Sequence, residues 1–195
     1  MAGLCGTMFG RWRAMLASGS KALSEEIEYF KTAEDYADQM RDELSRFLLD
    51  CAGHEMSAGS QRDVGIMLRM VVDLEDITDD CYSLVLLLDK AATRRLDIDK
   101  GEIASLGPYT QLVEDFLRFV QDNINRKISE EQLGVAKDLE DRIDDFRSVL
   151  KKKARKRLQT GADVKAELLF MDIVRHIEKI GDHAYGVAHA LRELK

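Results

Sequence analysis

The chain has 195 residues, of which 45% are hydrophobic and 33% are charged, and it contains a single proline. This composition excludes a disordered or collagen-like protein, and the length suits one domain or two small halves that share a core. The net charge of -7 argues against a nucleic-acid-binding module, because such a module needs a basic face to displace counterions from phosphates.

The cysteines and the N-terminal segment indicate a reduced, cytoplasmic protein. Cys5, Cys51 and Cys81 are odd in number and lack CxxC spacing, so neither a disulfide framework nor a zinc knuckle is supported. Arg11 and Arg13 interrupt the apolar N-terminal stretch before it reaches the length of a signal peptide. No apolar run elsewhere approaches the roughly 20 residues that cross a bilayer.

Breaks rich in glycine, serine and charged residues divide the chain into helical segments. The breaks are at residues 18–20, 52–60, 97–108 and 159–163. Between them, apolar residues recur at i, i+3, i+4 and i+7, which is the helix period and not the strand period. Ser129 and Gln132 resemble a capping box, and Ser24 lies at or near a helix start. The predicted fold class is therefore all-α, with helices over residues 4–17, 21–51, 58–95, 107–126, 129–158 and 163–193.

The second half of the chain repeats the first. The segment LEDITDDCY from Leu74 aligns with IEKIGDHAY from Ile177, and KTAEDYADQMRDEL from Lys31 aligns with KDLEDRIDDFRSVL from Lys137. The two offsets differ only by the length of one short loop, so the sequence predicts two tandem three-helix units. The predicted units are residues 1–97 and 98–195.

Acidic residues four apart recur in register in the two units. A chain this acidic contains several such pairs by chance, and any single pair is usually a solvated helix face. These acids are identical between the units, however, whereas their neighbours change: Asp76 aligns with Lys179, and Asp80 aligns with His183. The recurring acids are Glu34, Asp38, Glu75 and Asp79 in the first unit and Glu140, Asp144, Glu178 and Asp182 in the second.

These acids predict one carboxylate cluster in each unit. Side chains four apart on a helix lie about 5–6 Å apart on one face, and like charges at that range repel by on the order of 1 kcal/mol per pair or more. Arg41 and Arg147 also recur, three residues after Asp38 and Asp144, so an acid-arginine network could neutralise the charge. The alternative is a hard cation such as Mg²⁺, Mn²⁺, Ca²⁺ or ferric iron, with His183 as an additional potential ligand. A ferritin-like di-iron site is excluded because no histidine follows an acid by three residues.

The segment LLFMDIVRHIEKIGDHAYGVAHAL resembles the signature helix of the PhoU family of phosphate-transport regulators. LEDRIDDFRSVLKKKARKRLQTG is similar to the cytosolic C-terminal region of bacterial Na⁺/phosphate cotransporters. The resemblance begins near Leu23 and is weakest in the first helix, which looks shortened; Thr78 replaces a glycine of the family, and Gly186 replaces an asparagine. It implies six helices in two three-helix bundles, whose eight recurring acids hold multinuclear iron or zinc clusters; manganese, magnesium and calcium remain alternatives.

The resemblance implies a non-enzymatic, metal-binding regulator of phosphate uptake. Its implied partners are the membrane domain of a phosphate transporter or cotransporter and a sensor protein, with a peripheral position at the cytoplasmic membrane; a homodimer is left open. A metal-free helical adaptor with acid-arginine networks is the alternative function. No glycine-rich phosphate loop or nucleophile elbow points to catalysis.

A basic run ends the fifth predicted helix. Cations at this place complement the negative end of the helix dipole, and they would also suit a contact with anionic lipid or with a transporter. The residues are Lys151, Lys152, Lys153, Arg155, Lys156 and Arg157.

Overall fold

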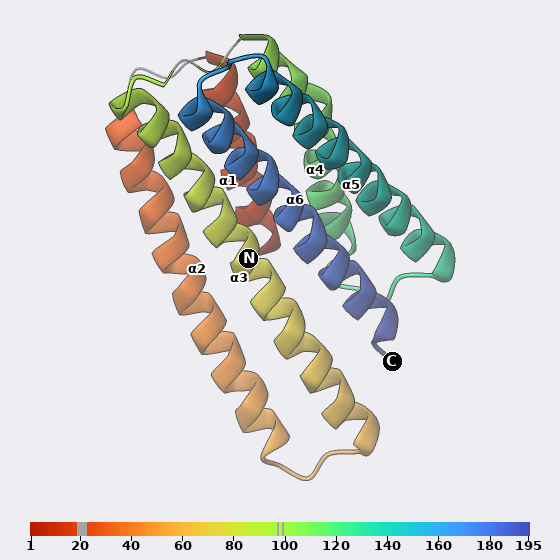
Figure 1. The fold of residues 1–195 in the computed structure, drawn as a ribbon. Helices are drawn as coiled ribbons and strands as arrows, with labels where there is room; N and C mark the ends of the chain where they lie inside the picture. Colours follow the sequence, from red (N-terminus) through yellow and green to blue (C-terminus); the bar gives the residue numbers. More distant parts are fainter. Residues whose placement is uncertain (19–22, 97, 99) are drawn as a thin grey trace.

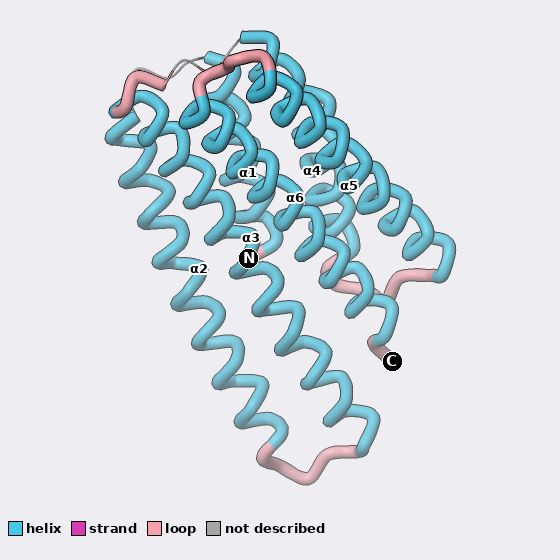
Figure 2. Tube along the Cα trace, viewed as in Figure 1, coloured by secondary structure: helices cyan, strands magenta, loops and turns pink. Residues whose placement is uncertain are grey.

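The computed structural model describes residues 1–18, 23–96, 98 and 100–195, and these residues form six helices and no strand (Figures 1 and 2). This confirms the all-α class. The helices are α1 (Ala2–Ser18), α2 (Leu23–Ala52), α3 (Ala58–Thr93), α4 (Lys100–Asn123), α5 (Glu130–Gln159) and α6 (Val164–Glu193). Among the described residues, no helix combines the length and apolar content that a bilayer span requires.

The fourth helix begins earlier than the predicted residue 107. Pro108 lies inside α4, where it lacks the N–H that would bond to the carbonyl of Ala104. Burial of Leu106 and Tyr109 offsets this loss and keeps the first turns helical. The predicted breaks at residues 19, 20 and 97, the predicted start of a helix at residue 21 and the predicted boundary between the units after residue 97 lie outside the described residues.

The capping box at the start of α5 is confirmed. The Ser129 hydroxyl accepts a hydrogen bond from the Gln132 backbone N–H at 3.1 Å, and the Gln132 side chain accepts one from the Ser129 N–H at 2.9 Å. Ser57 and Asp163 cap α3 and α6 in a similar way through their side-chain oxygens. Each cap satisfies backbone donors that the first helical turn leaves unpaired.

The most extensive helix-helix contact joins α3 and α6, which pack antiparallel at the centre (Figure 1). α2 flanks α3, α5 flanks α6, and α1 and α4 pack against each other and against the central pair. One continuous core joins both halves, so the two three-helix bundles bury their apolar faces together. Its largest fully buried side chains include Phe9, Trp12, Phe30, Tyr109, Phe116 and Phe170.

The first helix is shorter than its counterpart, as the sequence predicts. α1 has 17 residues and α4 has 24, and the far end of the α2/α3 hairpin projects beyond the other helices (Figure 1). A groove of about 680 Å³ lies beside the start of α1, lined largely by apolar side chains that include Leu44, Phe47 and Met67. Leu44 is 41% exposed, whereas Leu150, which aligns with it in the second repeat, is 2% exposed.

Candidate metal centres

The four recurring acids of the first repeat meet on the facing sides of α2 and α3. Glu34 and Asp38 lie one turn apart on α2, and Glu75 and Asp79 lie one turn apart on α3. Arg41 joins the two helices: its Nη1 donates to Glu75 Oε1 at 2.6 Å and lies 3.0 Å from Asp38 Oδ1. Both the predicted cluster and the predicted arginine contact are present.

The first cluster carries more negative charge than Arg41 can balance. Burial, with help from Asp38 and Asp79, raises the pKa of Glu75 to about 7, although Arg41 opposes the shift. Burial and neighbouring acids also raise the pKa of Glu34 and the pKa of Asp79. Within the described chain, Asp79 Oδ1 is buried and has no hydrogen-bond partner. An oxygen in this state is ready to accept a proton or a cation.

The second cluster repeats this geometry between α5 and α6. Arg147 Nη1 lies 2.6 Å from Glu178 Oε1 and 3.1 Å from Asp144 Oδ1, which reproduces the contacts of Arg41. Oxygens of Asp144, Glu178 and Asp182 all lie within 4.8 Å of one another. Burial raises the pKa of Glu178, and Asp182 adds to this shift, while burial and Asp144 raise the pKa of Asp182.

Glu140 lies at the edge of the second cluster. Its carboxylate pairs with Lys137 at 2.7 Å, and its charge still acts on Asp182. In the first repeat Lys31 occupies the aligned position and acts on Glu34. The structure therefore places the acids of each repeat near one another, but among the eight only Asp144, Glu178 and Asp182 lie within 4.8 Å of one another, and Glu140 is paired with Lys137 at the edge.

The ligand types of both clusters suit a hard cation, and the second cluster has the closer geometry. Its oxygens from Asp144, Glu178 and Asp182 lie within 4.8 Å of one another, whereas the first cluster holds a buried oxygen, Asp79 Oδ1, that lacks a hydrogen-bond partner in the described residues. Oxygen-rich sets of this kind suit Mg²⁺, Mn²⁺, Ca²⁺ or ferric iron, and carboxylates can bridge more than one ion. A cation at either cluster would share the acids with Arg41 or Arg147, or displace the arginine toward solvent.

The departure of Thr78 from the family pattern has a packing reason. A Cβ at Gly181, the aligned residue, would lie 3.0 Å from Ile143 Cδ1, so the second repeat needs glycine there. In the first repeat the position aligned with Ile143 is Ala37, which leaves space for a side chain. Thr78 fills that space, and its hydroxyl donates a hydrogen bond to the backbone carbonyl oxygen of Glu75 at 2.7 Å. The substitution leaves both acids of the motif in place.

The basic run on α5 divides into an inner and an outer part. Arg157 turns inward, where it pairs with the buried acids Glu102 and Glu167, the latter at 2.6 Å. The other cations of the run face outward: Lys151 is partly exposed, and Lys152, Lys153, Arg155 and Lys156 are exposed. Arg157 is thus held by the fold, whereas the remaining cations of the run face solvent to a greater or lesser degree.

Comparison with known proteins supports the PhoU-like part of the resemblance and does not test the likeness to cotransporter tails. Residues 111–191 match the PhoU domain family. The crystal structure of PhoU from Pseudomonas aeruginosa superposes with a TM-score of 0.86 at 16% sequence identity, over 98% of this chain and 90% of that one. No curated protein shows a significant sequence match. The structural similarity establishes a PhoU-like six-helix fold, and the family match covers most of the second repeat.

Proposed function

We propose that this chain, with its PhoU-like fold, is a non-enzymatic, metal-binding regulator of phosphate uptake. One observation carries the proposal: two carboxylate clusters, each with its arginine, occupy equivalent places in the two repeats. We place the protein at the cytoplasmic face of the membrane, beside the membrane domain of a phosphate transporter and in particular of a Na⁺/phosphate cotransporter. Multinuclear iron or zinc is the proposed cofactor, because the resemblance to the PhoU family implies it.

The proposed role of the acids is to make the stiffness of each hairpin depend on cations. In each repeat the acids come from two adjacent helices, so their repulsion pushes these helices apart when no cation is present. A bound cation supplies positive charge that the carboxylates of both helices share. The hairpin then presents a fixed surface to a transporter or sensor protein, and the outward cations Lys152, Lys153, Arg155 and Lys156 would contact anionic lipid or the transporter.

Metal analysis tests the cofactor part of the proposal. Protein purified without chelator should contain metal, and the double variant Glu178→Gln with Asp182→Asn should lose the share held by the second cluster. Asp138→Asn is a matched control, because this exposed acid of α5 pairs with Arg142 outside the cluster. Wild-type protein that contains no metal and takes none up from added iron, zinc or manganese would refute the metal assignment.

Phosphate uptake tests the regulatory part separately. In the native host, deletion of the gene should change the uptake of radiolabelled phosphate, and the wild-type gene should restore the original rate. The double variant at Glu178 and Asp182 should fail to restore it, whereas Asp138→Asn should succeed. Unchanged uptake in the deletion strain at both low and high phosphate would refute a role in phosphate transport, whatever the metal content.

Arg41 and Arg147 favour a second candidate, a metal-free adaptor. Each already bridges two acids of its cluster at 2.6 to 3.1 Å. If arginine is the only counter-charge, Arg147→Met should destabilise the protein by about 3 kcal/mol, because it leaves partly buried acids unpaired, and added metal should not restore stability. If a metal binds, added cation should recover most of the loss.

A further inference from the structure

The central helices α3 and α6 face each other with complementary chemistry. Asp73, Asp76 and Asp80 of α3 align with His176, Lys179 and His183 of α6 in the repeat. Because the helices pack antiparallel, the contacts form two related groups. In one group, Asp80 meets His176 at 2.7 Å and Lys179 at 3.5 Å. In the other, His183 meets Asp73 at 3.1 Å and Asp76 at 3.7 Å.

The two groups differ in their fixed charge. Lys179 supplies a permanent cation to Asp80, so the first group carries no net negative charge in either protonation state of His176. Asp73 and Asp76 form no ion pair with lysine or arginine among the described residues, and His183 is their only ion-pair partner. The group of Asp73, Asp76 and His183 therefore carries net negative charge in either protonation state of the imidazole, and this charge, which also raises the pKa of His183, attracts a cation.

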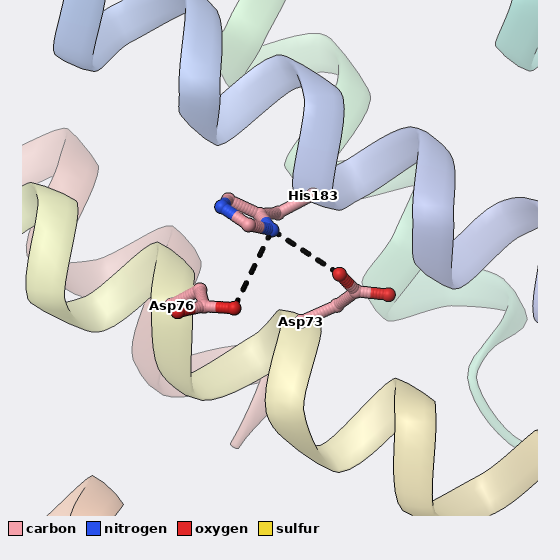
Figure 3. Close-up of side chains that lie close together, drawn as sticks. All are labelled: Asp73, Asp76 and His183. Atoms are coloured by element: carbon pink, nitrogen blue, oxygen red, sulfur yellow. Dashed lines mark hydrogen bonds and ion pairs between the residues drawn. The ribbon is translucent and has the colours of Figure 1, made fainter.

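The side chains of this group converge on one point (Figure 3). One carboxylate oxygen from each aspartate approaches the same Nδ1 of His183, and the three potential ligand atoms lie within 4.8 Å of one another. Ligands about 2.0–2.2 Å from a tetrahedral zinc ion lie about 3.3–3.5 Å apart. The observed separations of 3.1 and 3.7 Å bracket this value, so an ion fits after small side-chain movements.

The backbone of α6 leaves room for the aspartate ligand. A Cβ at residue 186 would lie 2.6 Å from Asp73 Oδ2, so only the glycine present there lets this carboxylate lie against the helix. The side chains of Asp73, Asp76 and His183 are 26%, 40% and 25% exposed, so water can complete the coordination of an ion. A pocket of about 260 Å³ lies beside the Asp73 end of the group and is lined by Asp73, Gly186 and Arg69 among others.

We propose that Asp73, Asp76 and His183 form a binding site for a divalent transition-metal ion, with zinc as the best candidate, that links the two repeats. The set of two oxygens and one imidazole nitrogen suits zinc better than calcium or magnesium, which prefer oxygen alone. This site is separate from the two carboxylate clusters, because its ligands come from α3 and α6 rather than from the helices of one repeat. It would fix the packing of α3 against α6.

Histidine NMR tests this site directly. The chain has only four histidines, so the side-chain nitrogens can be followed individually while zinc is added to chelator-treated protein. The Nδ1 resonance of His183 should shift with saturation, while that of His176 should stay in place. An unchanged His183 resonance at saturating zinc would overturn the proposal.

A variant built on the repeat provides a sharp control. Asp76→Lys gives this group one aspartate, one lysine and one histidine, which is the combination that the fold already tolerates at Asp80, Lys179 and His176. It should fold and lose the zinc-dependent shift of His183, and Asp73→Asn should weaken the shift. Glu178→Gln should preserve it even when the carboxylate cluster no longer binds metal. A shift that survives in the folded Asp76→Lys variant would show that zinc does not use these ligands.

Discussion

The two repeats share a cluster geometry but differ in how their hairpins are covered. In both, one arginine bridges an aspartate and a glutamate from adjacent helices at nearly the same distances. In the second repeat α4 packs against both helices of the hairpin, whereas in the first repeat the shorter α1 packs mainly against α3 and leaves a groove beside the hairpin. The comparison shows that the carboxylate cluster and the covering helix are independent parts of the repeat.

The largest expected contrast concerns aligned leucines near the hairpin ends. Leu150→Ala should lower the free energy of unfolding by about 2–5 kcal/mol, because it leaves a cavity in the shared core. Leu44→Ala should cost less than about 1 kcal/mol, because its side chain is already 41% exposed. Urea denaturation measures both. Equal losses would mean that the first hairpin is covered in solution.

A smaller difference in stability is expected from the packing of Gly181 against Ile143, which the first repeat replaces with Thr78 and Ala37. Gly181→Thr should destabilise the protein by about 1–3 kcal/mol, because the new side chain collides with Ile143. Adding Ile143→Ala copies the Ala37 and Thr78 pair of the first repeat and should recover part of the loss. A double variant that is less stable than Gly181→Thr alone in urea denaturation would show that the two repeats do not share this packing.

The pH dependence of the free energy of unfolding should reveal the contribution of Glu75 in the first cluster. In the metal-free protein burial raises the pKa of Glu75 to about 7 from its ordinary value of 4.5, so the native state binds more protons than the unfolded state between these values. Stability should therefore fall as the pH rises through this range. Glu75→Gln should remove much of the slope between about pH 5 and about pH 7.5, measured by urea denaturation. The control Asp138→Asn should keep the wild-type slope.

Much of this architecture could be predicted from the sequence, because helix periodicity and the internal repeat are local patterns. The capping box at Ser129 can be predicted from the sequence, and the alignment of the repeats predicts which helices carry the neighbouring acids. The start of α4 cannot be predicted in this way, because Pro108 normally marks a boundary and its tolerance depends on tertiary burial of Leu106 and Tyr109. The inward turn of Arg157 depends on Glu102 and Glu167, which belong to other helices.

The group of Asp73, Asp76 and His183 shows a second limit of sequence reasoning. Next to the acids that recur in both repeats, several residues change from acidic in the first repeat to basic in the second. Changes of this kind usually mark a solvent-exposed helix face. The antiparallel packing of α3 and α6 turns these positions toward each other, so the changes become complementary contacts. The alignment of the repeats contains these changes, but only the packing of α3 against α6 shows that the changed residues contact one another.

Thermal melting of chelator-treated protein, with and without added iron or zinc, tests the central claim most directly. If the two carboxylate clusters bind cations, saturating metal should raise the melting temperature of the wild type by about 5–10 °C. The double variant Glu75→Gln with Glu178→Gln should lose most of this rise, while the Asp76→Lys variant should keep most of it. A wild-type melting temperature that does not change with either metal, or an equal rise in the double variant, would contradict the account.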